Sequence, residues 1–93
     1  MAELFQQPKI TGYRQLNDAE AALMNAIKAK GNELAVLVRE LERYLAEQKV
    51  RAVGREVERI EQAQPGKWLA VGKTDLQVGL MALTRAVAQP GAF

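Results

Sequence analysis

The chain has 93 residues with a net charge of +2, and it contains no cysteine and no histidine. A chain of this length forms at most one domain and buries only a modest share of its surface, so small proteins usually add disulfides, metals or self-association. Without cysteine and histidine, disulfides, the commonest zinc ligand and the usual general base are excluded, and self-association is the remedy that remains.

Residues 1–16 contain Pro8 and Gly12 and show no sustained apolar period, so we expect an extended arm or a short helix before a turn. The segment lacks the basic start and apolar core of a signal peptide. No run of about eighteen apolar residues occurs, so we expect no membrane span. Asn17 can cap a helix, and Glu20 stands where a capping-box partner would, which predicts a helix start here.

Residues 17–63 are expected to form one long helix or a pair of helices. The stretch lacks proline and is rich in good helix formers. Its first apolar residues share one helical face: Leu23, Ile27, Leu34, Val38, Leu41 and Leu45. The period then slips by five residues to Val50, and Gly54 follows. This predicts a single helix with a stutter or kink, or two helices that break near residues 47–54.

A further helix is expected over residues 67–88, and its apolar residues occupy most sides. They are Trp68, Leu69, Val71, Leu76, Val78, Leu80, Met81, Leu83, Ala86 and Val87. Gly72, Gly79 and Ala86, spaced seven apart, add a stripe of small residues. A helix that is apolar nearly all round must be buried nearly all round, which one partner helix cannot do but neighbouring subunits can.

These elements predict an all-α fold. Residues 1–93 form a single helical domain made of the arm (1–16), the long helix or helix pair (17–63) and the C-terminal helix (67–88), packed as a helical oligomer.

Gly72-Lys73-Thr74 is similar to the end of a phosphate-binding loop. That loop requires a glycine five positions before Gly72, where this chain has Lys67, and no strand is expected before it. We therefore expect Gly72 to permit close helix packing, with Lys73 and Thr74 on a helix and facing a cavity.

The chemistry-bearing residues point to binding and not to catalysis. No nucleophile–base pair can be built without histidine or cysteine, and most carboxylates lie within three or four residues of an arginine or lysine, as in helical ion pairs. We expect no enzyme activity, no metal site and no cofactor.

Tyr13 and Arg14 precede the first helix. A tyrosine beside a guanidinium can stack on a flat ring such as a base, or it can staple the helix start. Lys28 and Lys30 lie on the helix that follows, where either lysine alone suits a solvated face.

Three stretches together resemble a known family: TGYRQL at Thr11–Leu16, LMNAIKAKGNEL at Leu23–Leu34 and WLAVGKTDLQVGLMALTRAVAQP at Trp68–Pro90. They are similar to the small phage anti-CBASS protein two family, the cyclic-oligonucleotide sponges. The resemblance covers about half of the chain, and its last stretch is the most specific.

The resemblance implies an all-helical hexamer that acts in the cytoplasm of the infected bacterial host. Such proteins sequester cyclic dinucleotides such as cyclic GMP–AMP, made by host defence cyclases, without cleaving them, and some also hold cyclic trinucleotides. The family's dinucleotide pocket lies between protomers. It implies that Tyr13 stacks on a base and Lys28 meets a phosphate, with Arg14 and Asn25 in the same two stretches.

The trinucleotide pocket of the family implies roles for Lys30, Gly31 and Lys73, with Thr74 beside them. Lys73 stands where arginine is common, and a lysine offers a point charge in place of a bidentate fork. Trinucleotide binding is therefore less strongly implied than dinucleotide binding.

Two other functions remain open from the residues. A helical coiled-coil adaptor without a small-molecule ligand would explain residues 34–60 but not Tyr13 and Lys28. Binding of polymeric nucleic acid along the long helix is disfavoured, because Glu40 and Glu58 are among acids that would repel phosphates.

Overall fold

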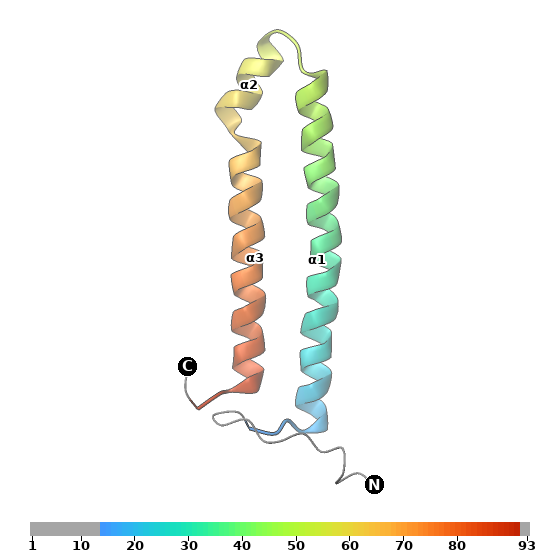
Figure 1. Cartoon of the computed structure of the whole chain (residues 1–93), viewed down its shortest axis with the longest axis vertical. Coiled ribbons are helices and arrows are strands. Elements are labelled where there is room, and N and C mark those ends of the chain that lie inside the picture. Colours follow the sequence, from blue (N-terminus) through green and yellow to red (C-terminus); the bar gives the residue numbers. More distant parts are fainter. Residues whose placement is uncertain (1–13, 92–93) are drawn as a thin grey trace, which may run out of the picture.

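A computed structural model describes residues 14–91, which fold as a helical hairpin. Its helices are α1 (Asp18–Arg51), α2 (Arg55–Ala63) and α3 (Pro65–Ala88). α1 forms one arm, while α2 and α3 run back along it as the other, bent arm (Figure 1). The molecule extends 68 × 28 × 20 Å. No strand occurs within residues 14–91, which confirms the all-α prediction; most of the predicted arm lies outside the described residues.

The start of α1 is fixed by the predicted capping box. The backbone N–H of Glu20 donates to Asn17 Oδ1 at 2.8 Å, and the N–H of Asn17 donates to Glu20 Oε1 at 3.0 Å. These bonds satisfy two donors that have no partner inside the helix. Asp18 in the first turn and Arg51 in the last also match the helix dipole.

α1 and α2 are separate helices, which decides between the two readings of residues 17–63. Ala52 ends α1 in an extended conformation, and Gly54 precedes α2 with a φ of 62°. A side chain would strain this left-handed backbone, so glycine suits the tip of the hairpin. The break falls inside the predicted window of residues 47–54.

α2 and α3 meet at Gln64, whose left-handed backbone (φ 51°, ψ 54°) ends one helix and caps the next. Pro65 occupies the first turn of α3, where a missing N–H costs nothing. α3 therefore starts two residues before the expected Lys67. It ends at Ala88 as expected, with Gln89 in a left-handed conformation (φ 49°).

α1 and α3 meet along a narrow seam. The less exposed nonpolar residues of α1 are spaced alternately by three and four: Met24, Ile27, Gly31, Leu34, Val38 and, seven further on, Leu45. This is the spacing of an antiparallel coiled-coil-like pair. Val38 is the one buried apolar residue of the described chain, at 8% exposure. Leu23, expected on the apolar face, is 56% exposed, because α3 covers only one stripe of α1.

Of the described glycines, Gly31 lies closest to the side chains of the opposite helix. A Cβ built there would lie 3.3 Å from Leu80 Cδ1 on α3. The missing side chain lets the α3 leucine pack against the α1 backbone. Glycine lowers the stability of the helix itself by about 1 kcal/mol relative to alanine, but it permits this close packing.

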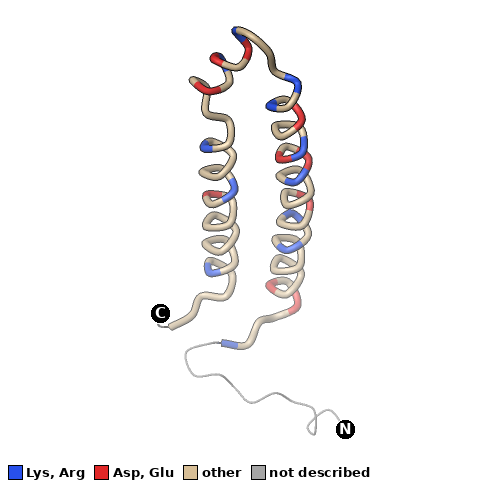
Figure 2. The backbone as a smooth tube through the Cα atoms, turned by 45° about the horizontal axis from the view of Figure 1, so that its top comes forward, with Lys and Arg blue, Asp and Glu red and all other residues tan. Residues whose placement is uncertain are grey.

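α3 remains apolar on the sides that α1 does not cover. Trp68 and Met81 are 62% and 70% exposed, and Val78 and Leu83 are exposed as well. Figure 2 shows both signs of charge distributed along α1 and α2, and few charges on α3. Large exposed apolar surfaces of this kind usually mark an interface. The exposed face of α3 therefore supports the prediction of an oligomer, which stays a prediction.

Two further features concern the described residues only. Within residues 14–91 no helix combines the length and apolarity needed to cross a bilayer. The same residues hold no group of three or more acidic, histidine or cysteine side chains placed to share a metal ion.

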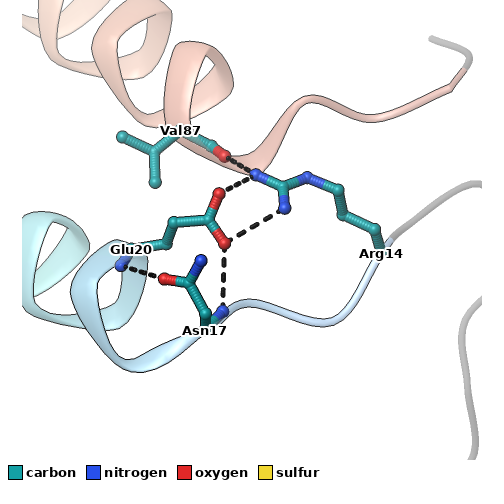
Figure 3. A network of polar contacts seen from close by, with 4 residues as sticks. All are labelled: Arg14, Asn17, Glu20 and Val87. Atoms are coloured by element: carbon teal, nitrogen blue, oxygen red, sulfur yellow. Dashed lines mark hydrogen bonds and ion pairs between the residues drawn. The ribbon is translucent and has the colours of Figure 1, made fainter.

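A polar network ties the start of α1 to the end of α3 (Figure 3). The guanidinium of Arg14 forms a two-pronged ion pair with Glu20, with Nη1 donating to Oε1 at 3.1 Å. Nη2 also donates to the backbone carbonyl of Val87 at 2.7 Å. That carbonyl lies in the last turn of α3 and has no partner within its helix. We call these contacts the Arg14–Glu20–Val87 network.

Replacing Gly31 by leucine should destabilise the hairpin by about 1–3 kcal/mol, the usual result of overpacking. Leucine is a better helix former than glycine, so a loss of stability would report crowding against Leu80 and not helix propensity. Thermal unfolding followed by circular dichroism measures the change. Gly66→Ala is the matched control, because an added Cβ there meets no atom within 4 Å. A Gly31→Leu protein as stable as the parent would contradict the close approach.

Glu20 should contribute to stability in a pH-dependent way. Its hydrogen bond from Arg14, and then that from the Asn17 N–H, hold its pKa below the ordinary value of 4.5. The contribution is therefore complete above the ordinary pKa and is lost as the pH falls through the lower pKa of the folded protein. Glutamine can keep the capping box. The difference in unfolding free energy between the parent and Glu20→Gln, measured in urea, should shrink on acidification below about pH 4.5; a constant difference would contradict the assignment.

Candidate ligand-binding site

A groove of about 710 Å³ lies between α1 and α3 near the open end of the hairpin. Its lining residues come from both helices and the segment after α3: Met24, Asn25, Ile27, Lys28, Gly31, Leu80, Met81, Thr84, Arg85, Ala88 and Pro90. The volume falls in the range of sites for drug-sized ligands. Three residues predicted to bind ligand, Asn25, Lys28 and Gly31, are therefore brought together in one place.

The walls of the groove are largely apolar. Ile27 and Leu80 lie on the seam, while Met24 and Met81 add flexible, polarizable side chains. Methionine adapts to irregular shapes and makes favourable contacts with aromatic rings. Such walls suit a flat heterocycle.

Both charged side chains among the described residues that line the groove are basic. Lys28 lines it from α1 and Arg85 from α3, and none of the described residues that line the groove carries a carboxylate. Within residues 14–91 the Lys28 ammonium has no ion-pair or hydrogen-bond partner. Two cations on opposite walls can meet two separated anionic groups.

Two neutral polar side chains complete the groove. Thr84 Oγ1 donates to the carbonyl of Leu80 at 2.9 Å, which occupies its only hydrogen and leaves the oxygen as an acceptor. The Asn25 amide offers both donors and acceptors. A few polar groups among apolar walls are the usual means of orienting a ligand.

The remaining predicted site residues lie elsewhere. Lys30 pairs with Glu33 at 3.3 Å and does not line the groove. Lys73 faces a smaller hollow of about 120 Å³ that also includes Gly31, and its Nζ lies 3.7 Å from Glu42 Oε1. Thr74 is exposed and lines neither hollow.

Tyr13 and Arg14, the two predicted site residues of the N-terminal arm, differ from the residues that line the hollows. Arg14 is engaged within the protein, in the Arg14–Glu20–Val87 network. Tyr13, the expected stacking residue, lies outside the described residues.

Sequence reasoning missed the contribution of α3 to the groove, above all Arg85. It is the one basic residue in the last turn of a helix that is otherwise apolar there. Met81, Thr84, Arg85 and Ala88 recur at spacings of three, one and three, which places them along one side of α3. The sequence prediction includes only Met81 of these four, as part of the apolar surface of the helix, and it assigns no binding role to the other three.

Comparison with known proteins agrees with this architecture. The Acb2/Tad1 hairpin domain matches residues 8–88. The chain is also similar to Anti-CBASS protein 2 of Pseudomonas phage JBD67, at 39% identity over an alignment of 102 positions that covers 91% of this chain and 94% of that protein. The match extends over both arms of the hairpin and the groove between them, and it confirms the resemblance seen in the sequence. The chain belongs to the Acb2/Tad1 hairpin domain family.

Proposed function

We propose that this chain is a phage protein that opposes CBASS immunity inside the infected cell by binding and sequestering cyclic dinucleotides such as cyclic GMP–AMP. The observation that carries the proposal is the groove with Lys28 on one wall, Arg85 on the other and no carboxylate among its described lining residues. Kinship with an anti-CBASS protein of a phage supports the biological setting.

The chemistry of the ligand matches the groove. A cyclic dinucleotide carries two phosphates and two bases on one ring. Lys28 offers a positive charge to a phosphate, Arg85 adds a second basic side chain to the groove, and apolar walls with two methionines accept the bases. Asn25 and Thr84 add hydrogen-bonding groups at the same level.

Tyr13 and Arg14 also have roles in this proposal. Arg14 is bound to the Val87 carbonyl, next to the groove residues Arg85 and Ala88. Tyr13 directly precedes Arg14 in the chain, and we assign it the stacking role that the family resemblance implies.

Sequestration without cleavage is supported by the residue types. Phosphodiester hydrolysis by general acid–base catalysis requires a group that titrates near neutral pH, usually histidine or a carboxyl group. The described lining residues include neither. The groove is therefore suited to holding its ligand intact.

The active form is proposed to be a hexamer. The groove of one hairpin is open to solvent, and the exposed apolar side chains of α3 outside the groove include Trp68 and Val78. Packing of neighbours against α3 would both bury this apolar surface and close the groove, which strengthens charged contacts by excluding water.

Cyclic trinucleotide binding stays a prediction. Lys73 is paired with Glu42 beside a hollow of about 120 Å³, which is far smaller than the groove. Lys30 and Thr74 lie outside both hollows. A trinucleotide pocket from these residues would need contributions from other protomers. The coiled-coil adaptor is the competing function, and it predicts no ligand at all.

Purified protein should deplete cyclic GMP–AMP from solution reversibly, because the groove holds the ligand without breaking it. Heating the complex should return intact ligand, as measured by chromatography and mass spectrometry. Native mass spectrometry should show hexamers carrying ligand. Recovery of a linear nucleotide would contradict sequestration, and absence of any binding would favour the adaptor.

Lys28→Gln and Arg85→Gln should each weaken cyclic GMP–AMP binding by about 10- to 100-fold, since a hydrogen bond to a charged group is worth about 1.5–3 kcal/mol. Tyr13→Ala should weaken it comparably through lost stacking, worth about 1–3 kcal/mol per base. Isothermal titration calorimetry measures the affinities. Lys30→Gln is the matched control, because it removes one positive charge two residues from Lys28 but outside the groove. Equal losses for Lys28→Gln and Lys30→Gln would show that the effect is only net charge.

A further inference from the structure

We infer that Arg14 and Glu20 are positioning residues that set the width of the ligand groove, a role that rests on the proposed function. Glu20 belongs to no wall of the groove, and Arg14 touches Glu20 and Val87. Both act through the helix ends that they join.

The groove lies between two fixed points. At its inner end, the close approach of Gly31 and Leu80 sets the distance between the helices. At its outer end, the Arg14–Glu20–Val87 network joins residues 73 positions apart in the chain. No covalent link joins α1 to α3 at this end, since their connection runs through residues 52–64 at the other end (Figure 1).

The network is directly adjacent to the groove walls. Glu20 lies one helical turn before Met24 on the same side of α1, and Met24 lines the groove. Val87 is flanked by Ala88, and Arg85 is two residues away; both of these line the groove. A change in the distance between Glu20 and Val87 therefore moves Lys28 and Arg85 relative to each other.

The same network also keeps a negative charge away from the ligand. Glu20 is the carboxylate in the first turns of α1 closest in sequence to the groove residues, and Arg14 neutralises it with both guanidinium ends (Figure 3). Without Arg14, the Glu20 charge would stand near a groove built for anions. Without Glu20, Arg14 keeps its positive charge and its bond to Val87 stays available.

This asymmetry separates a positioning role from direct contact with ligand. If the network sets the width of the groove, Glu20→Gln should weaken cyclic GMP–AMP binding about three- to tenfold. This is the size expected when a partly exposed ion pair affects binding only through the positions of other residues. Arg14→Gln should weaken it more, because it also leaves Glu20 unneutralised. The double variant Arg14→Gln/Glu20→Gln should bind better than Arg14→Gln alone.

If Arg14 instead touched the phosphate, Glu20→Gln would release it and leave binding unchanged or tighter. The double variant would then bind as poorly as Arg14→Gln. Either result overturns the inference. Affinities are measured by calorimetry on the full-length protein, and native mass spectrometry confirms that each variant keeps the parent's oligomeric state.

Arg59→Gln and Glu56→Gln are the matched controls. This pair on α2 is also a two-pronged ion pair, with Arg59 Nε donating to Glu56 Oε2 at 3.0 Å, but it lies outside the groove. These variants should lose a similar amount of stability and no affinity. Loss of affinity in the controls would assign the effect to general destabilisation. Failure of the parent protein to bind any cyclic dinucleotide would defeat the proposed function itself, which keeps the two failures distinct.

Discussion

A helix can cover only one stripe of another helix, and this limit shapes the whole molecule. In the hairpin, α1 and α3 share a seam in which Val38 is the only buried apolar residue of the described chain. On its remaining surface, α1 carries charges of both signs together with exposed apolar side chains such as Leu37 and Tyr44. α3 carries few charges, and its exposed apolar side chains include Trp68 and Val78. Apolar surface that the partner helix leaves open favours packing against a further surface. In the proposed function, self-association and ligand binding would therefore both use α3.

The seam between α1 and α3 also determines where the groove lies. At Gly31 the helices come close because one side chain is missing. Toward the open end the lining changes to Met24, Lys28, Met81 and Arg85, whose long side chains leave room between the backbones. The apolar part of the groove is therefore a continuation of the hairpin core. Its charged part comes from residues at the edge of the seam, where lysine and arginine can stay hydrated until an anion replaces the water.

Local features of the fold were predictable from sequence, because they depend on neighbours in the chain. The Asn17–Glu20 capping box, the break near Gly54 and the end of α3 at Ala88 all follow from short-range chemistry. The site was only partly predictable. The family resemblance points to Lys28, which lines the groove, but the rotation of α3 about its own axis decides that Arg85 also lines it and that Lys73 meets Glu42. That rotation depends on packing between residues some fifty positions apart.

The Arg14 contact shows the same limit in another form. In the sequence, Arg14 is a cation beside a tyrosine. No neighbouring residue indicates that it also donates to a backbone carbonyl in the last turn of α3. Backbone acceptors carry no residue-specific signal. Leu23, which fits the apolar period as well as Met24 does, is exposed for a related reason: periodicity locates a face to within one residue, and only the partner helix decides between neighbours.

Placing the groove at the open end leaves the opposite end of the hairpin free to change. The tip at residues 52–54 and the bend at Gln64 touch none of the groove residues. Adding or removing seven residues in both arms would preserve the alternation of three and four along the seam, and each such step would change the length of the hairpin by about 10 Å. The length of the hairpin can thus change without changing the residues that line the groove. Length and groove composition are set by opposite ends of one short chain.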